Sequence, residues 1–340
     1  MNREELFTMM TAYKQTSVLK AGIQLSVFDH LADGPVGVET VAKAVGAAPR
    51  GVEVLLNALA AIRVVETEKE RYWISPETAD LLVTTRAGYA GGMVAVFAGD
   101  AEWDAVNKIS AAVRNGGTVL DDNAETPNYG FWEDFATHAH VVAAPTAGIL
   151  VEQIGDWARG RQELKVLDVA CGHGVYGYSV AQAFEHAHVW SLDWDNVLPV
   201  AKEHATRMGV ADRTSYLAGD MFTTDLGGPY DLVLITNVMH HFSEEKALEL
   251  LKRGASVLTP GGRVGLVGFT TSEKPPAQDP APYLFDILML IWTTGGHVHS
   301  GEAYERMLGE AGLRGLADEA VPGLAFHVLT AEQAEARADT

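Results

Sequence analysis

The sequence predicts an α/β protein whose C-terminal half forms a doubly wound, mostly parallel sheet, preceded by an N-terminal half made mainly of helices. Three observations support this prediction. A short apolar run at 165–169 leads into a glycine-rich turn, and a helical pattern follows near 177–185. Further apolar runs then alternate with helical patterns, as in a parallel sheet wrapped on both faces. Near the N-terminus, apolar residues instead recur with the helical period.

Length and composition restrict the classes of protein to consider. The chain has 340 residues, enough for two domains, and 47% are hydrophobic, enough for a sizeable core. Its net charge of −20 argues against binding to nucleic acid or to anionic membranes. No run of 18 apolar residues occurs, so no membrane span is predicted. The only cysteine, Cys171, excludes an intrachain disulfide, and we expect a reducing, cytoplasmic location.

Residues 3–31 are predicted to form a helix with more apolar residues than one short segment can cover. We expect a partner chain to bury these apolar residues. Helices at 38–45 and 49–62 and strands at 64–66 and 72–74 then predict a winged helix-turn-helix. Its second helix carries only Arg50 as a basic residue, so we expect it to pack rather than to read DNA, and a regulatory role is disfavoured.

The middle of the chain is broken by glycines, with helices expected near 89–97 and 103–114 and a loop at 121–127. A helical pattern over 129–154 leads to the sheet, and Pro145 should begin a new helix there or kink this one.

The C-terminal half alternates strands and helices. After the glycine-rich turn, strands are predicted at 188–192, 214–217, 232–236, 264–268, 316–320 and 326–329. Helices are predicted at 197–208, 244–258, 283–292 and 301–312, the second with Ser243 as its N-cap. A turn at 260–262 precedes one strand, a proline-rich surface loop follows it, and 331–340 should be a polar tail.

The glycine-rich turn carries Gly172, Gly174 and Gly177, a pattern that alone fits either a dinucleotide or another nucleoside ligand. Asp168 ends the preceding strand, where a carboxylate would repel a pyrophosphate but attract an ammonium group. Asp193 follows Gly172 by 21 residues, at the end of the next strand, where an acid binds a ribose diol. Together with a third acid, Asp220, these residues favour a cationic amino acid joined to a nucleoside, which fits S-adenosylmethionine and fits NAD poorly.

These motifs resemble those of a known family. The matching stretches are VLDVACGHG, SLDWDNVLPVA, GDMF, YDLVLITNVMHHF, LTPGGRV and DILMLIWTTGGHVHSGEAYERMLGEAGL. They are similar to class I S-adenosylmethionine-dependent small-molecule O-methyltransferases with a winged-helix dimerisation domain. The resemblance implies a Rossmann-like, seven-stranded methyltransferase sheet and a homodimer. It also implies a dimerisation domain at 1–85, a helical linker lining the substrate pocket at 86–155, a cofactor domain at 156–330 and a tail at 331–340.

The resemblance and the turn imply a set of site residues. Those expected to bind S-adenosylmethionine, or its product S-adenosylhomocysteine, are Asp168, Gly172, Gly174, Asp193, Trp194, Gly219, Asp220, Met221, Phe222 and Asn237. Those expected to contact a small acceptor are Trp103, Phe131, Trp132, Phe135, Met239, Met289, Trp292 and His297.

The catalytic candidates are His240 and His241, just after a strand of the sheet. Methyl transfer to a hydroxyl needs a general base, and in the resembled family the first histidine of this block has that role. Two positions depart from the family: His241 stands where an acid is usual, and Val298 stands where a glutamate orients the base. Asp286 or a group on the substrate could replace that glutamate.

Several functions therefore remain open. The first is O-methylation of a small acceptor typical of secondary metabolism, with His240 as the base. The others are C- or N-methylation, a cofactor-binding protein with different chemistry, and, least favoured, a winged-helix regulator. We expect no metal, but His240, His297 and His299 could instead bind an ion that assists the reaction.

Overall fold

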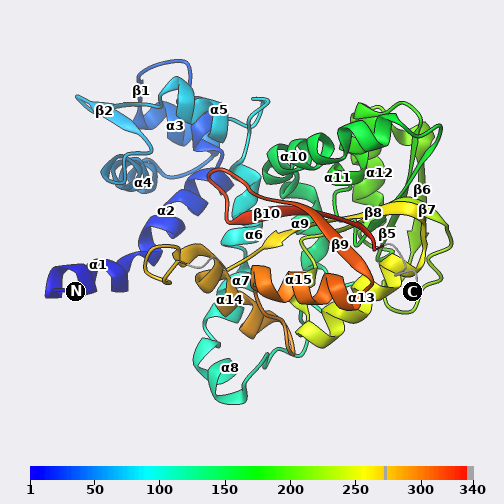
Figure 1. The fold of residues 1–340 in the computed structure, drawn as a ribbon. Helices are drawn as coiled ribbons and strands as arrows, with labels where there is room; N and C mark the ends of the chain where they lie inside the picture. Colours follow the sequence, from blue (N-terminus) through cyan, green and yellow to red (C-terminus); the bar gives the residue numbers. More distant parts are fainter. Residues whose placement is uncertain (272–273, 335–340) are drawn as a thin grey trace, which may run out of the picture. The chain divides into compact units, whose positions relative to one another are not determined.

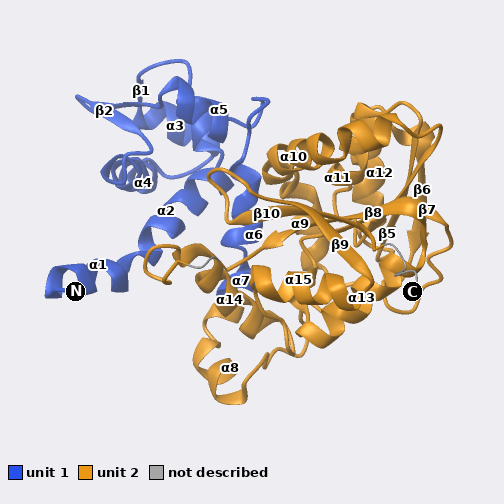
Figure 2. Cartoon of the chain, viewed as in Figure 1, with its two compact units in different colours: residues 1–103 blue, residues 104–340 orange. Residues whose placement is uncertain are grey.

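The computed structural model describes residues 1–271 and 274–334, and the chain divides into two compact units, residues 1–103 and 104–340 (Figures 1 and 2). The boundary falls within 86–155, the segment expected to be a linker. Residues 86–103 group with the N-terminal elements and residues 104–155 group with the sheet, so the linker has no unit of its own.

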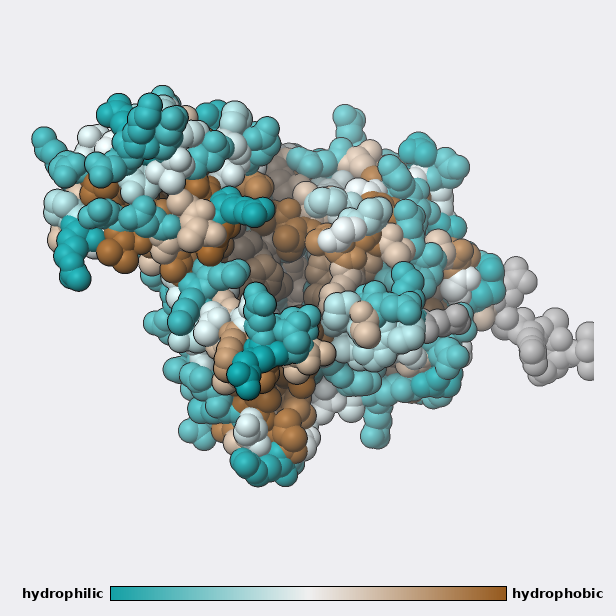
Figure 3. All heavy atoms as spheres, turned by 90° about the vertical axis from the view of Figure 1, so that its left-hand side faces the viewer, coloured by the Kyte–Doolittle hydropathy of each residue, from teal (hydrophilic) through white to brown (hydrophobic). Residues whose placement is uncertain are grey.

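The first unit begins with α1 (Arg3–Thr11), α2 (Tyr13–Gln24) and a 3-10 turn, η1 (Val27–His30). The predicted single helix over 3–31 is therefore wrong. The chain leaves the helix at Leu25, and Ser26 takes a left-handed φ of 53°, which an α-helix cannot contain. Helix α1 buries none of its residues, and hydrophobic side chains reach the surface on the face of the molecule that Figure 3 shows.

A small helical module follows. Helices α3 (Val38–Val45) and α4 (Pro49–Ala61) match the prediction closely, and α5 (Pro76–Leu82) comes after the strands. Strands β1 (Val36–Gly37), β2 (Glu66–Glu68) and β3 (Arg71–Trp73) pair in the order β1-β3-β2. The turn between β2 and β3 consists of Lys69 and Glu70, both left-handed, which places β2 two residues later than predicted.

The connecting helices are shorter than predicted. A 3-10 turn, η2 (Gly91–Met93), precedes α6 (Val94–Phe97). The helix expected at 103–114 is two helices, α7 (Asp100–Val106) and α8 (Ile109–Asn115).

Likewise, the pattern at 129–154 is α9 (Phe131–His138) and α10 (His140–Arg159), so the break lies at Ala139 and not at Pro145. Helix α10 continues through Pro145, which is exposed, so the missing hydrogen bond lies on its solvent side.

The predicted fold class is confirmed in the second unit. Its sheet contains β4 (Leu164–Val169), β5 (Ala187–Asp193), β6 (Thr214–Ala218), β7 (Tyr230–Thr236), β8 (Leu258–Phe269), β9 (Leu313–Ala320) and β10 (Phe326–Gln333). Their order is β6-β5-β4-β7-β8-β10-β9. The pairs among β6, β5, β4, β7 and β8 are parallel, whereas β10 is antiparallel to both of its neighbours.

Helices cover both faces of this sheet (Figure 1). Helix α10, α11 (Val175–Ala183) and α12 (Leu198–Arg207) pack on one face, and α13 (Glu244–Ser256) and α15 (Gly301–Glu310) pack on the other. Alternate residues of β7 pack into the hydrophobic cores on opposite faces of the sheet. Leu232 and Leu234 belong to the core beneath α10, α11 and α12, and Val233 and Ile235 belong to the core beneath α13 and α15. Because the strands are buried on both faces of the sheet, their sequences are continuous apolar runs.

Three boundaries in this unit differ from the prediction. Strand β8 already begins at Leu258 and includes the expected turn at 260–262, because a register shift between Tyr230 and Leu232 accommodates the extra residues. Helix α14 (Pro280–Trp292) begins at a proline, an allowed first position, inside the expected loop. Strand β10 extends to Gln333, so the predicted tail starts too early; residues 335–340 lie outside the described part.

Candidate active site

The glycine-rich turn joins the carboxyl end of β4 to α11. Ala170, Gly172 and Gly174 all have left-handed φ values, 53°, 54° and 72°. A Cβ on Gly174 would lie 2.1 Å from the ring of Tyr178, and a Cβ on Gly177 would lie 2.9 Å from the Asp168 carboxylate. Glycine is therefore required both for the backbone conformation and for close packing of the turn.

Asp193 connects this turn to the end of β5. Its Oδ2 accepts a hydrogen bond from Gly172 N–H at 2.7 Å, and its Oδ1 accepts one from Trp194 N–H at 2.7 Å. Burial raises the pKa of the Asp193 carboxyl to about 6, although these two donors oppose the rise. At neutral pH the side chain is a carboxylate that still has lone pairs free for a ligand.

Asp168 lies beneath the same turn and is fully buried. Its Oδ2 accepts a hydrogen bond from Gly177 N–H at 3.2 Å, while Oδ1 has no partner within the part of the chain that the structure describes. Burial raises the pKa of the Asp168 carboxyl to about 8. An unpaired buried carboxylate oxygen is costly, so a cation beside it would stabilise the charged form.

Asn237, at the end of β7, has a similar arrangement. It takes a left-handed φ of 53°, and its Nδ2 donates to Tyr176 Oη at 3.0 Å. Its Oδ1 is buried and has no partner in residues 1–271 and 274–334. A strained backbone and an unused acceptor at the carboxyl edge of the sheet are typical of a binding site.

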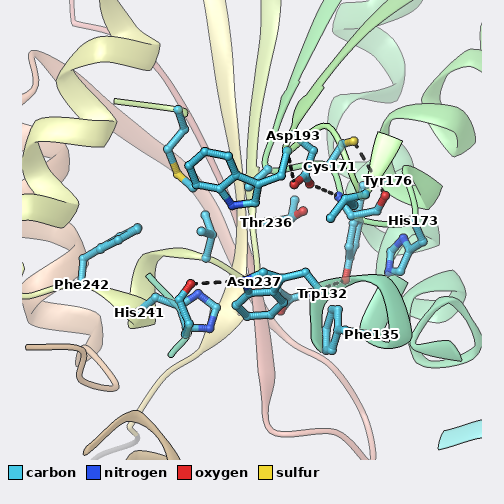
Figure 4. A pocket seen from close by; sticks show the side chains of 17 residues that line it. Trp132, Phe135, Cys171, His173, Tyr176, Asp193, Thr236, Asn237, His241 and Phe242 are labelled. Carbon is cyan, nitrogen blue, oxygen red and sulfur yellow. Dashed lines mark hydrogen bonds between the residues drawn. The ribbon is translucent and has the colours of Figure 1, made fainter. Parts of the chain in front are cut away.

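Asp193, Asn237 and the glycine-rich turn border a pocket with about 670 Å³ of empty volume, part of it open to solvent (Figure 4). Helix α9, the loop before it, and the ends of β4, β5 and β7 supply most of its wall. Trp132 and Phe135 from α9 lie across from the turn. Asp193 is the only carboxylate, and no lysine or arginine occurs, among the described residues that line it.

The pocket fits S-adenosylmethionine. Its wall carries negative rather than positive charge, because the lining includes the carboxylate of Asp193. Burial lowers the pKa of His173 to about 3, so that imidazole is neutral and adds no positive charge. The unpartnered oxygens of Asp168 and Asn237 are acceptors that the ammonium group of an amino acid could satisfy. Asp193 lines the pocket with lone pairs that could accept hydrogen bonds from a ribose diol.

The two histidines after β7 differ in exposure. They belong to a 3-10 turn, η4 (Met239–His241), and their ring centroids are 4.6 Å apart. His241 is half-buried and lines the pocket, with its ring 5.2 Å from that of Trp132. His240 is 3% exposed and does not line the pocket.

The structure brings only part of the predicted site together. The predicted residues that line the pocket are Gly172, Asp193, Trp194, Met221, Asn237, His241, Trp132 and Phe135. Asp168 and Gly174 lie beneath it, whereas Gly219, Asp220 and Phe222 follow β6 outside its lining. There, Asp220 Oδ1 accepts from Phe222 N–H at 2.8 Å.

The predicted acceptor contacts separate into several groups. Phe131 and Trp292 pack against each other, with centroids 4.4 Å apart, in an aromatic cluster beside α8. Met239 and Met289 are buried, and Trp103 belongs to the first unit, where its Nε1 donates to Ala98 O. None of these five residues lines the pocket.

The sequence interpretation also missed residues that do line the pocket. They are Ala124, Ala170, Cys171, His173, Tyr176, Val197, Thr236, Val238 and Phe242. Several of them are adjacent in the sequence to a predicted residue, and that adjacency is the signal that could have identified them. Ala124 had no such signal, because it comes from the loop before α9.

The alternative metal site is not assembled. His297 is exposed and its Nδ1 lies 2.9 Å from Asp286 Oδ2, while His299 is buried with its Nε2 3.2 Å from Met239 O. Within residues 1–271 and 274–334, no group of three or more histidine, cysteine, aspartate or glutamate side chains could bind a metal ion.

Two models of known protein families match this chain. An O-methyltransferase domain model matches residues 160–314, and an O-methyltransferase dimerisation domain model matches residues 7–85, so together they span more than half of the chain. The chain belongs to the O-methyltransferase family. It is therefore an S-adenosylmethionine-dependent methyltransferase.

Relatives of this O-methyltransferase match it along nearly its whole length. A 3-hydroxy-5-methyl-1-naphthoate 3-O-methyltransferase from Streptomyces sahachiroi is 26% identical, over 90% of this chain and 88% of its own. A proposed O-methyltransferase from Nostoc punctiforme, 28% identical, superposes with a TM-score of 0.90 over 98% of this chain and all of its own. Human N-acetylserotonin methyltransferase in complex with S-adenosylmethionine has the same fold, with a TM-score of 0.83 at 21% identity over 98% of this chain and 99% of its own.

Proposed function

We propose that this enzyme methylates a hydroxyl group of a small, planar, uncharged acceptor of secondary metabolism. The observation that carries the proposal is the composition of the pocket beyond the cofactor groups. Trp132, Phe135 and Phe242 are aromatic, and His241 is the titratable group beside them. The described lining residues include no lysine or arginine that could bind an acidic acceptor. Relatives that support a small acceptor of this class include a mitomycin biosynthesis 6-O-methyltransferase from Streptomyces lavendulae and an acetylserotonin O-methyltransferase from Mus musculus.

The chain's own residues provide binding and proton transfer. Asp168, Asp193 and Asn237 would bind the cofactor, which when bound supplies a methyl group on a sulfonium. Trp132 and Phe135 would stack on the acceptor and exclude water, which is chiefly a positioning contribution. A neutral imidazole in η4, His240 or His241, would remove the hydroxyl proton.

The reaction can be tested with methyl-labelled S-adenosylmethionine and a panel of phenols that includes 2-naphthol and 4-nitrophenol. We expect label in at least one phenol, and an O-methyl signal in the NMR spectrum of the product. Label on carbon or nitrogen instead would favour the alternative reactions, among which N-methylation is represented by the relative N,N-dimethyltransferase OxyT. Binding of the cofactor without transfer to any member of a broad panel would contradict the proposal.

We also propose that the enzyme is a homodimer formed through its winged-helix module and α1. The match to a dimerisation domain supports this, and so do the exposed hydrophobic side chains of α1, among them Phe7 (57% exposed) and Met10 (63%). A surface of this kind normally pairs with another protein surface. None of the described helices is long and apolar enough to span a membrane. A cytoplasmic location remains a prediction from the single cysteine.

The dimer leads to a specific expectation. The double variant Phe7→Glu/Met10→Glu should shift light scattering at micromolar concentration from the mass of two chains toward one, because charges would be buried in the interface. Val113→Glu, an equally exposed position on α8 in the other unit, is the matched control and should stay dimeric. A monomeric wild-type protein, or a double variant that stays dimeric, would refute the interface.

A further inference from the structure

His240, the base implied by family resemblance, lies in surroundings that oppose a positive charge. Its Nδ1 is buried and has no hydrogen-bond partner among the described residues. Burial lowers the pKa of its imidazole well below the usual value, with His241 and His299 adding to the effect. Val298 is fully buried at the position where the family carries its orienting glutamate. Asp286 does not replace that glutamate, because its carboxylate binds Val298 N–H at 2.7 Å and His297 Nδ1.

The aromatic rings around His240 do not compensate. Phe269 and Phe285 stack with centroids 3.7 Å apart and planes 15° apart. The His240 centroid lies 4.9 Å from that of Phe285 and 5.8 Å from that of Phe269, nearly perpendicular to both. These distances place the imidazole beside the stack, against ring edges. Because aromatic edges carry partial positive charge, they would destabilise an imidazolium.

His241 has the features that His240 lacks. It lines the pocket against Trp132, so an acceptor there can reach it. Burial lowers the pKa of its imidazole to about 4, but the charge of Glu125 acts in the opposite direction. The imidazole is therefore neutral at pH 7 and able to accept a proton, and the charge of Glu125 would stabilise the product of that transfer.

Glu125 is held in place by Thr294 and Lys246. Its Oε1 accepts hydrogen bonds from both Thr294 N–H and Thr294 Oγ1–H at 2.7 Å, and its Oε2 lies 3.6 Å from Lys246 Nζ on α13. The preceding residue, Ala124, lines the pocket; its N–H donates to Trp292 O, and its carbonyl accepts from Trp132 Nε1. The loop thus fixes both the wall of the pocket and the carboxylate behind it.

We propose that His241, not His240, accepts the proton of the acceptor, and that Glu125 is the positioning residue that stabilises the resulting imidazolium. The proposal rests on the proposed O-methylation. The O–H bond of the acceptor breaks and its proton moves to an imidazole nitrogen of His241. The oxygen then bonds to the methyl carbon as the carbon–sulfur bond of the sulfonium breaks, and that electron pair stays on sulfur. The imidazolium later releases its proton to water.

The first test compares the two histidines. With methyl-labelled cofactor and a phenol that the wild type accepts, His241→Gln should lower kcat by about 100-fold or more. His240→Gln should cost at least about tenfold less than His241→Gln. Calorimetry with S-adenosylmethionine should give wild-type affinity for both variants, which separates lost chemistry from lost folding. The reverse ranking would overturn the proposal, whereas a wild type that methylates no hydroxyl would instead refute the proposed function.

The second test needs no acceptor. In protein labelled with ¹³C-histidine, the pKa of His241 can be followed by NMR, with His241→Gln used to assign its signal. Glu125→Gln keeps an oxygen for Thr294 but removes the charge, so the pKa of His241 should fall and kcat should drop by about three- to tenfold. Glu245→Gln removes an exposed charge on α13 as the matched control and should change neither. An unchanged His241 titration in Glu125→Gln would refute the role of Glu125.

Discussion

Asp193→Ala should weaken the binding of S-adenosylmethionine by about 100-fold or more. The carboxylate would accept two hydrogen bonds from the ribose, each charge-assisted and worth about 1.5–3 kcal/mol, and together they account for at least two orders of magnitude in Kd. The same side chain accepts hydrogen bonds from Gly172 N–H and Trp194 N–H, so its loss should also loosen the turn that we expect to bind the cofactor. Isothermal titration calorimetry of the cofactor-free enzyme measures the effect directly.

Two variants make that result interpretable. Asp195→Ala removes an exposed carboxylate two residues later and should bind the cofactor normally. Asp193→Asn keeps an acceptor oxygen but not the charge, and its affinity should lie between those of Asp193→Ala and the wild type. A circular dichroism spectrum like that of the wild type would show that the fold persists. Unchanged affinity in folded Asp193→Ala would exclude Asp193 from the cofactor site.

The sheet and its cofactor edge were predictable because strongly local signals determine them. An apolar strand, a glycine turn that tolerates left-handed backbone and an acid at the next strand end are all short-range patterns, and β4, β5 and Asp193 lie where those patterns placed them. The break at Ala139 was not predictable, because no proline or glycine marks it. Pro145, the obvious candidate, is tolerated on an exposed helix face, which only the tertiary structure decides.

The aromatic side of the pocket was harder to predict, for a physical reason. Its residues come from segments far apart in the chain, and aromatic side chains at helical spacing look alike whether they line a cavity or fill a core. Trp132 lines the pocket, whereas its neighbour Phe131 packs on Trp292. Glu125 is more remote still, because its link to Thr294 spans 169 residues and leaves no pattern in the sequence.

Asp168 should make the stability of the cofactor-free enzyme depend steeply on pH. Burial raises the pKa of this carboxyl to about 8 in the folded chain, from an ordinary value of 3.8. The folded state therefore retains a proton that the unfolded state releases across this range. The contribution of this group to stability is complete below pH 4 and is lost as the pH rises toward 8, by up to about 1.4 kcal/mol per pH unit. Urea unfolding at several pH values measures it.

Asp168→Asn tests both the cost and the purpose of this buried acid. The amide cannot ionise, so the variant should gain stability relative to the cofactor-free wild type between pH 5 and pH 8, by several kcal/mol at the upper end.

Asp168→Asn should also bind S-adenosylmethionine at least about tenfold more weakly, because the unpaired Oδ1 is lost as a charged partner for the ammonium group. In the wild type, binding should release a proton below pH 8 and therefore tighten as the pH rises from 6 to 8. Asp195→Asn, which removes a nearby exposed charge, should show none of these changes. A stability difference that stays constant with pH, together with normal cofactor affinity, would mean that Asp168 serves only to hold Gly177 N–H.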